Sequence, residues 1–292
     1  MPMVFGAIAP HGFSVMLEMS DDAEGGLKTR ASMEEMERRL KATAPDVVVI
    51  AGPHGFRVEG SICVADVGRG AGTLSWNGRQ VEMNVPIDGE MTDAIIQAAE
   101  AKGVSVARGG YAGTRRSQSV MPIDWGVITP LWFAGHGRNM VGHGHVLAPK
   151  PQGPEGPPVV IATPSRSQPR EHQIAFGQAI AEASETDGRR VAFIASCDWG
   201  HRHSEAGPYG YHEASARVDA QIVDAVKSED LRRLLAISDE EANEAAIDGL
   251  WQTLILQGVL EHTPMPVDLL SYEAPTYYGM IVATYSGDAA AS

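Results

Sequence analysis

Short runs of apolar residues without polar alternation are the feature that most constrains the fold of this chain. Clear examples are residues 4–9, 46–51 and 190–196, the second of which has the sequence DVVVIA. A strand with one face in water alternates apolar and polar residues, so an unbroken apolar run indicates a strand buried on both faces. Such strands are typical of the middle of a mostly parallel sheet covered by helices.

Segments with helical periodicity lie between these runs along the chain. Helices are predicted at residues 33–43, 93–102, 172–183 and 214–227, with further strands at 104–107 and 158–162. The alternating, glycine-bearing stretch 60–83 predicts edge strands or hairpins. We therefore predict an α/β fold: one large domain over residues 1–292, with a mostly parallel central sheet flanked by helices and with peripheral β-hairpins. The Gly/Pro-rich segment 149–158 is interpreted as a surface loop.

Composition excludes several classes of function. With 292 residues, 43% of them hydrophobic, the chain can bury a large core, and two cysteines are too few for a disulfide or metal framework. A net charge of −14 disfavours a nucleic-acid partner, which requires a positive surface. The first residues lack the pattern of a signal peptide, and no apolar run reaches membrane-spanning length. We expect a cytoplasmic protein that acts on small molecules, away from membranes.

A repeated motif is the most specific signal for chemistry. A Pro-His-Gly-Phe turn follows the first predicted strand and presents His11, and the same four residues follow the strand at 46–51 and present His54. Proline before and glycine after each histidine favour a sharp turn. Because the ends of neighbouring parallel strands lie side by side, we expect the two imidazoles to converge on one ion, and Fe, Zn, Cu and Ni all accept imidazole.

A further polar cluster follows the buried strand at 190–196. Its sequence is SCDWGHRH and contains His201 and His203, and Tyr209 lies a few residues beyond it. His201 would lie at the same sheet edge as the other two histidines, and the ordinary pKa of imidazole suits proton transfer at neutral pH. We predict His201 as the proton-transfer group and interpret His203 as a polar residue of a surface loop.

The carboxylate that would complete a metal site is expected from residues 238–260, which we predict as one helix. Ser238 can cap its acidic first turn. Glu240, Glu244 and Asp248 are spaced four apart and would share one helix face. Glu244 and Asp248 lie nearer the apolar part of the segment, and the residues alone leave both open as ligands.

With these motifs the chain resembles the class III extradiol ring-cleavage dioxygenases, the superfamily of the protocatechuate 4,5-dioxygenase catalytic subunit. The resemblance covers most of the chain. It rests on the two Pro-His-Gly turns, the Asp124-x-Gly126 segment that runs into Thr129-Pro130-Leu131, the strand ending in SCDWGH, the segment 241–260 and the tail 271–280.

The resemblance implies Fe(II) as the cofactor, with His11 and His54 as ligands. It also implies that His201 is the acid/base histidine of an SGDLSH-like motif, which here is SCDWGH and keeps the histidine. For the third ligand the family has a glutamate, and we predict Glu244. Asp248 is the alternative. It is the second choice because its side chain is one methylene shorter than that of glutamate.

Substrate contacts are predicted at Asp124, Trp125 and Tyr209. Family members often have a histidine where this chain has Trp125. The implied activity is cleavage of the ring of a catechol or aminophenol with O2, outside the diol, in an aromatic catabolic pathway. Some relatives pair with a second subunit and others work alone, and for this chain we expect a homo-oligomer or pairing with a second subunit. The alternatives are a Zn-dependent hydrolase and a noncatalytic metal-binding relative on the same fold.

Overall fold

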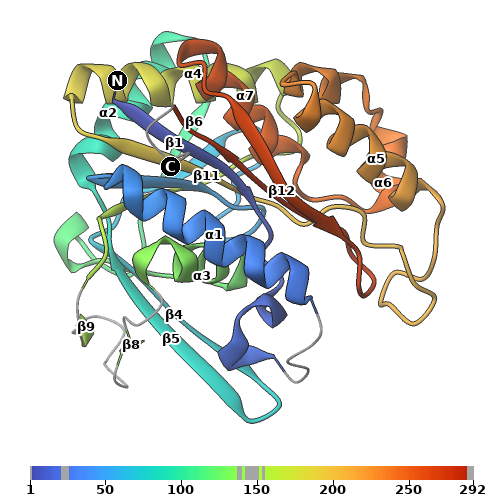
Figure 1. The fold of residues 1–292 in the computed structure, drawn as a ribbon. Coiled ribbons are helices and arrows are strands. Elements are labelled where there is room, and N and C mark those ends of the chain that lie inside the picture. Colours follow the sequence, from blue (N-terminus) through green and yellow to red (C-terminus); the bar gives the residue numbers. More distant parts are fainter. Residues whose placement is uncertain (1, 21–25, 137–139, 142–150, 153–154, 288–292) are drawn as a thin grey trace.

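A single eight-stranded sheet forms the centre of the molecule (Figure 1). The computed structural model describes residues 2–20, 26–136, 140–141, 151–152 and 155–287. In spatial order the strands are β12 (Val267–Glu273), β13 (Met280–Tyr285), β1 (Met3–Ala9), β11 (Val191–Ser196), β2 (Val47–Ala51), β10 (Val159–Thr163), β3 (Ile62–Ala65) and β6 (Val106–Gly109). The four strands β1, β11, β2 and β10 are mutually parallel. The predicted mostly parallel sheet is confirmed.

Helices cover both faces of this sheet. On one face lie α2 (Gly89–Ala101), α4 (Arg170–Asp187) and α7 (Leu250–His262), and on the other α1 (Leu27–Thr43) and α3 (Trp125–Leu131) (Figure 1). Successive residues of β2 alternate between two separate cores, Val47 and Val49 on one side and Val48 and Ile50 on the other. Since both sides of the strand meet helices, every residue of β2 is buried, and this explains its unbroken apolar run.

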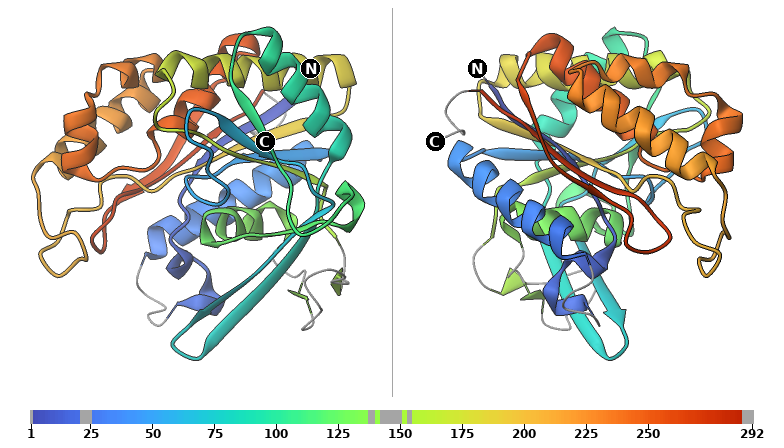
Figure 2. Two further views of the ribbon diagram at one scale, coloured as in Figure 1. Left: turned by 180° about the vertical axis from the view of Figure 1, so that it is seen from behind. Right: turned by 45° about the vertical axis from the view of Figure 1, so that its right-hand side comes forward.

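Smaller sheets lie at the periphery. The strands β5 (Arg79–Pro86), β4 (Arg69–Trp76) and β7 (Val120–Pro122) form a three-stranded sheet, and its β4–β5 hairpin projects away from the centre (Figure 2). The pair β8 (Met140–Val141) and β9 (Pro151–Gln152) is also described. The predicted peripheral hairpins are therefore present. Segment 149–158 was interpreted as a surface loop, and its residues 149–150 and 153–154 lie outside the described part of the chain.

The remaining elements are helical and lie mainly beside the sheet. They are α5 (Ala214–Lys227), α6 (Asp239–Ala245) and the short turns η1 (Phe13–Val15), η2 (Leu17–Met19), η3 (Arg116–Gln118), η4 (Trp132–His136) and η5 (Leu231–Ala236). Within the described part of the chain, no helix is both long and apolar enough to cross a membrane.

The segment 238–260 differs from the predicted continuous helix, because it forms two helices. Ser238 caps α6 as expected, with Glu241 completing the capping box. The helix then ends at Ala246, which has a left-handed backbone with φ of 51°. The next helix, α7, begins after Gly249, where a Cβ atom would lie 2.6 Å from Cβ of Cys197. The break lets the start of α7 pack against the end of β11.

Candidate metal centre

Three side chains of the candidate site lie at the carboxyl edge of the central strands. His11 follows β1, His54 follows β2, and Asp198 follows β11, which lies between the other two strands. In the strand register Ala9 pairs with Ser196, and Ala195 pairs with Ala51, so the three strands end at the same level. Ligands of open α/β sheets bind at this edge. The ring centroids of His11 and His54 are 5.2 Å apart.

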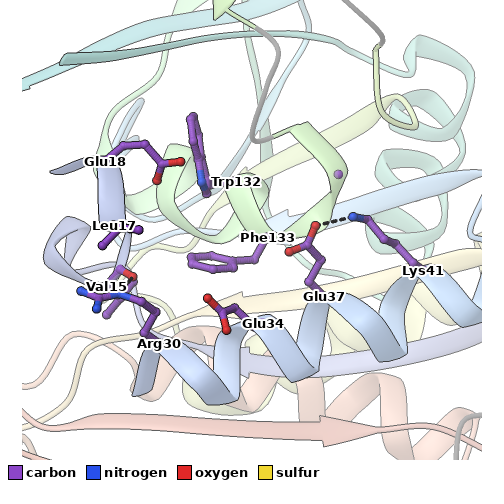
Figure 3. A pocket seen from close by; sticks show the side chains of 10 residues that line it. Val15, Leu17, Glu18, Arg30, Glu34, Glu37, Lys41, Trp132 and Phe133 are labelled. Atoms are coloured by element: carbon purple, nitrogen blue, oxygen red, sulfur yellow. Dashed lines mark hydrogen bonds and ion pairs between the residues drawn. The ribbon is translucent and has the colours of Figure 1, made fainter. Parts of the chain in front are cut away.

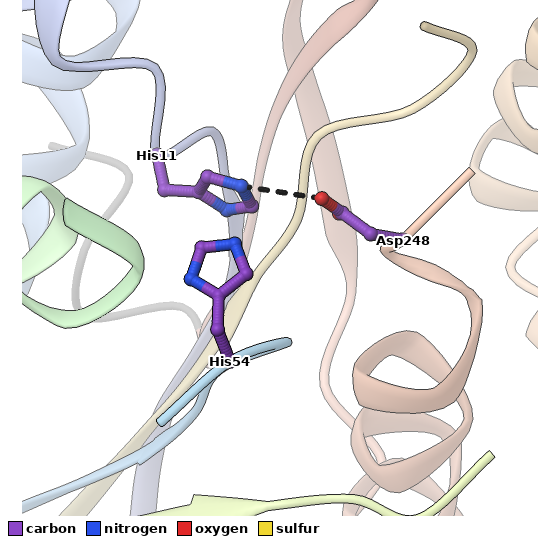
Figure 4. A group of neighbouring side chains, drawn as sticks. All are labelled: His11, His54 and Asp248. Atoms are coloured by element: carbon purple, nitrogen blue, oxygen red, sulfur yellow. Dashed lines mark ion pairs between the residues drawn. The ribbon is translucent and has the colours of Figure 1, made fainter. Parts of the chain in front are cut away.

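Three side chains form a cluster that suits a divalent metal ion. One nitrogen each from His11 and His54 and one carboxylate oxygen of Asp248 all lie within 4.8 Å of one another. In Figure 4 the two histidines project from separate loops toward each other, and Asp248 approaches from the segment that precedes α7. Two imidazoles and one carboxylate are the protein ligands of the facial-triad iron sites, which keep open positions for other ligands.

His11 is buried and is oriented by hydrogen bonds at both ends of its ring. The hydroxyl of Ser196 donates to the Gly126 carbonyl at 2.5 Å, so its oxygen can accept from Nδ1 of His11 at 3.2 Å. Nε2 of His11 then faces two carboxylates, since oxygens of Asp198 and Asp248 both lie 3.3 Å away. The backbone N–H of His11 also donates to Asp198 at 3.1 Å.

The charges at this point favour a cation. Burial alone would lower the pKa of His11, but the carboxylates of Asp198 and Asp248 outweigh it and raise the pKa to about 9. Burial and the charge of Asp248 raise the pKa of Asp198, whereas His11 holds the pKa of Asp248 below its ordinary value against the effect of burial. The carboxylate of Asp198 is buried and 13% of the Asp248 side chain is exposed, so these two negative charges around one imidazole favour a compensating positive charge, which a metal ion is chemically suited to supply.

The carboxylate of Asp124 orients the ring of His54. Burial would raise the pKa of Asp124, but the interaction with His54 lowers it, and Oδ2 of Asp124 lies 3.1 Å from Nδ1 of His54. Asp124 also caps α3 by accepting from Gly126 N–H at 2.9 Å. A proton on Nδ1 leaves Nε2 available to a metal, as in the carboxylate–histidine pairs of metalloproteins. Asp124 remains a predicted substrate contact, and the structure shows that it also contacts a candidate metal ligand.

Glu244, the predicted third ligand, is not brought to the histidines. It lies on α6 with 39% of its side chain exposed, and its carboxylate is 3.8 Å from the guanidinium of Arg217. The carboxylate beside the histidines is that of Asp248. The physical reason is the break between α6 and α7, because a continuous helix would have placed the two acidic residues on the same face.

His201 lies beside the cluster, and three tyrosine rings surround it. Its Nε2 is 3.8 Å from Oδ2 of Asp248. Tyr209, Tyr277 and Tyr278 have ring centroids 5.9, 6.1 and 5.8 Å from that of His201, and the ring of Tyr278 is nearly parallel to it at 24°. His201, predicted as the proton-transfer group, and Tyr209, predicted as a substrate contact, therefore lie close together.

Sequence reasoning missed Tyr277 and Tyr278, which come from the loop between β12 and β13. The available signal was the pair of adjacent tyrosines in SYEAPTYYGM. Tyr278 is buried, and its hydroxyl approaches the first Pro-His-Gly-Phe turn so closely that a Cβ atom on Gly12 would lie 2.1 Å from it. The glycine of that turn is thus required by packing at the site.

Trp125 lies beside His54, whereas His203 pairs with a carboxylate outside the cluster. The ring of Trp125 is 4.8 Å from that of His54, and 43% of Trp125 is exposed, so it lies at the edge of the cluster. His203 was interpreted as a polar loop residue. Its Nε2 lies 2.8 Å from the buried carboxylate of Asp219. Asp219 also accepts from the backbone N–H of Gly200, so the pair anchors the loop that carries His201.

A separate cavity of about 490 Å³ lies away from this chemistry. Figure 3 shows it between α1, which contributes Arg30, Glu34 and Glu37, and η4, which contributes Trp132 and Phe133. None of the residues of the histidine cluster lines it. The metal-binding candidates and this cavity are therefore distinct features.

Comparison with known proteins gives three findings. The family described as the catalytic LigB subunit of aromatic ring-opening dioxygenase matches residues 6–283. Protein CA_C1420 of Clostridium acetobutylicum is 24% identical over 268 residues, which are 91% of this chain and 54% of that protein. The chain therefore spans about half the length of this relative. The crystal structure of the uncharacterized protein JW3007 from Escherichia coli K12 has a TM-score of 0.60 at 11% identity, covering 96% of this chain and 99% of the other, and supports the fold alone.

Proposed function

The chain belongs to the family of the catalytic LigB subunit of aromatic ring-opening dioxygenases, and from that membership we propose that it is an Fe(II)-dependent extradiol dioxygenase. The proposed substrate is an aromatic diol or aminophenol, and the proposed reaction is ring cleavage with O2. One observation carries the proposal: His11, His54 and Asp248 offer ligand atoms within 4.8 Å of one another, and His201 lies beside the same carboxylate.

The metal would be held by His11, His54 and Asp248. Bound Fe(II) would supply Lewis acidity toward the diol and a path by which electrons of the diol reach dioxygen. The outer partners Ser196 and Asp124 fix the two imidazole rings by hydrogen bonds at Nδ1. Such partners maintain the tautomer and the ring direction that a metal ligand needs.

His201 is proposed to carry protons. Its Nδ1 is buried without a partner among the described residues, whereas its Nε2 faces the carboxylate of Asp248. From this position Nε2 would take a proton from a phenolic hydroxyl of the bound substrate and later return a proton to a product oxygen. An imidazole nitrogen can both accept and donate a proton, as these two steps require.

The surrounding aromatic side chains are proposed to hold the substrate ring. Trp125 lies on the His54 side of the cluster, and Tyr209, Tyr277 and Tyr278 lie around His201. Aromatic walls favour a planar ring through offset or edge-to-face contacts. They also restrict the access of water to the reacting atoms.

A matched pair of histidine variants tests the proposal. Protein reconstituted anaerobically with Fe(II) should consume O2 with one or more of catechol, protocatechuate, gallate and 2-aminophenol. His54→Ala should abolish this uptake because it removes a ligand. The control His262→Ala should retain it, since His262 contacts Glu185 at the other end of α7.

Two results would contradict the proposal. The first is oxygen uptake by His54→Ala at the rate of the parent chain. The second is a protein that binds zinc and shows no response to Fe(II), a result that would favour the hydrolase alternative.

We further propose that residues 1–292 form one catalytic domain that works as a homo-oligomer or beside a second subunit. Light scattering measures the molar mass of the purified chain. A mass that is a multiple of 31.1 kDa indicates a homo-oligomer, and a mass of 31.1 kDa indicates a monomer that would need a second subunit.

A further inference from the structure

Asp219 is a fully buried carboxylate on α5 that contacts both of the loops around His201. Its Oδ1 accepts from the Gly200 N–H at 2.8 Å. Its Oδ2 accepts from the Tyr272 hydroxyl at 2.9 Å and lies 2.8 Å from Nε2 of His203. Asp219 is not one of the metal-binding candidates, so its burial needs another explanation.

The loop after β11 and the loop between β12 and β13 are joined by backbone hydrogen bonds. The Trp199 N–H donates to the Gly279 carbonyl, and the Gly279 N–H donates to the Gly200 carbonyl, both at 2.9 Å. The His203 N–H donates to the Tyr277 carbonyl at 3.1 Å. The first loop carries the proposed proton carrier, and the second carries two of the tyrosines that surround it. The two loops are therefore expected to move as one unit.

Two glycines let this pair of loops lie directly on α5. A Cβ atom on Gly279 would lie 1.9 Å from Oδ2 of Asp219. A Cβ atom on Gly200 would lie 2.6 Å from Cβ of Ser215, and the hydroxyl of Ser215 accepts from the Arg202 N–H at 3.0 Å. Because no side chain separates the loops from the helix at these points, the carboxylate of Asp219 contacts both loops at once.

The hydrogen bonds of a buried carboxylate fix directions more than they add stability. Replacing a buried ionic group by apolar packing is often neutral or stabilising. Charge-assisted hydrogen bonds are nevertheless short and strong, so a carboxylate aligns the groups that donate to it. The alignment matters here because the ring of Tyr278 is 5.8 Å from that of His201 and nearly parallel to it, and the two rings come from the two loops.

We propose that Asp219 is a positioning residue for the reaction, which holds His201 beside the tyrosine rings and at its distance from Asp248. Nε2 of His201 is 3.8 Å from Oδ2 of Asp248 in this arrangement. A group that transfers protons must be within hydrogen-bond reach of the atoms it serves, so a small shift of its loop slows the reaction. The inference rests on the proposed function, because His201 carries protons only within that function.

Steady-state kinetics of the Fe(II)-loaded protein test the positioning role. Asp219→Asn keeps the size of the side chain and removes its charge. It should lower kcat for O2 uptake by about 10- to 100-fold, the effect expected of a misplaced reacting group. KM should change less, because the metal still binds the substrate, and the affinity for Fe(II) should be unchanged.

Asp88→Asn is the matched control. Asp88 is also a buried carboxylate, and it caps α2 and pairs with Arg189. It lies at the other edge of the sheet, since its N–H donates to the carbonyl of Val159, the first residue of β10. Asp88→Asn should lower stability and leave kcat unchanged. A loss of kcat in Asp219→Asn alone therefore separates positioning from general destabilisation.

A second measurement does not require the reaction. In protein labelled with 13C at histidine and loaded with diamagnetic Zn2+, ring currents of the neighbouring tyrosines should displace the NMR signals of the His201 ring, which a His201→Gln spectrum assigns. Most of this displacement should disappear in Asp219→Asn, and none of it in Asp88→Asn. His203→Ala removes one partner of the carboxylate and should give a smaller change in the same direction. It carries both measurements if Asp219→Asn does not fold.

Parental kcat in Asp219→Asn would overturn the inference, and so would His201 signals at their parental positions. If these signals move as expected but the parent protein consumes no O2, Asp219 still positions His201 and the proposed dioxygenase function fails.

Discussion

At the scale of single residues, the identity of the third ligand decides what the site can hold. Asp248 has a shorter side chain than glutamate, yet its carboxylate lies 3.3 Å from His11 and 3.8 Å from His201. The chain compensates by bringing the start of α7 close to the sheet edge. Asp198 adds a second buried carboxylate at the same distance from His11, so the negative charge at the centre exceeds that of a single carboxylate.

The first prediction separates the two acidic candidates. Asp248→Asn should weaken Fe(II) binding by at least about 100-fold, beyond the 10- to 100-fold typical of losing an outer partner of a ligand. Glu244→Gln removes an equivalent charge from an exposed position and should leave the affinity unchanged. Competition with a chromophoric chelator under argon measures both. Loss of binding in Glu244→Gln, with retention in Asp248→Asn, would restore the original assignment of the ligand.

At the scale of elements, local patterns predicted the strands and failed at one junction. The apolar runs of β1, β2 and β11 are local properties of the sequence, and so is the repeated turn after the first two. The end of α6 at Ala246 depends instead on packing of Gly249 against Cys197, which is distant in sequence. For the same reason Tyr278 could not be placed beside His201, because the β12–β13 loop reaches the site only in the folded sheet.

The second prediction concerns the crossing of α4 and α7, which positions Asp248. A Cβ atom on Gly258 would lie 1.9 Å from the Ile174 carbonyl, and one on Gly177 would lie 1.9 Å from the Ile255 carbonyl. Gly258→Ala should therefore separate the helices and lower the free energy of unfolding by about 1–3 kcal/mol. The control Gly110→Ala meets no atom within 4 Å and should be nearly neutral.

Chemical denaturation measures the stability of both variants, and chelator competition measures their affinity for Fe(II). Because α7 carries the cluster at its start, Gly258→Ala should also bind the metal more weakly than Gly110→Ala. A Gly258→Ala protein with parental stability would show that the two helices do not cross as closely as the structure indicates.

At the scale of the whole molecule, the phenol groups of three tyrosines make the stability of the fold depend on pH. Burial is the first cause that raises the pKa of Tyr272, Tyr278 and Tyr285, and nearby acidic groups add to it. Above the ordinary phenol pKa of about 10, the unfolded chain releases protons that the folded chain retains. Stability should be unaffected below that pH and should fall as the pH rises above it, by about 1.4 kcal/mol per pH unit for each fully buried phenol.

The last prediction uses Tyr285, whose buried hydroxyl has no hydrogen-bond partner among the described residues. Tyr285→Phe removes both an unpaired polar group and one phenol that must ionise on unfolding. It should be at least as stable as the parent at pH 7 and should unfold at a higher pH, followed by circular dichroism together with absorbance of phenolate. Tyr272→Phe is the control: it loses a hydrogen bond of 2.9 Å to Asp219, so the same change should lower stability at pH 7. A Tyr285→Phe protein that unfolds at the parental pH would mean that this phenol ionises without unfolding, and alkaline sensitivity would then lie with the tyrosines at the site.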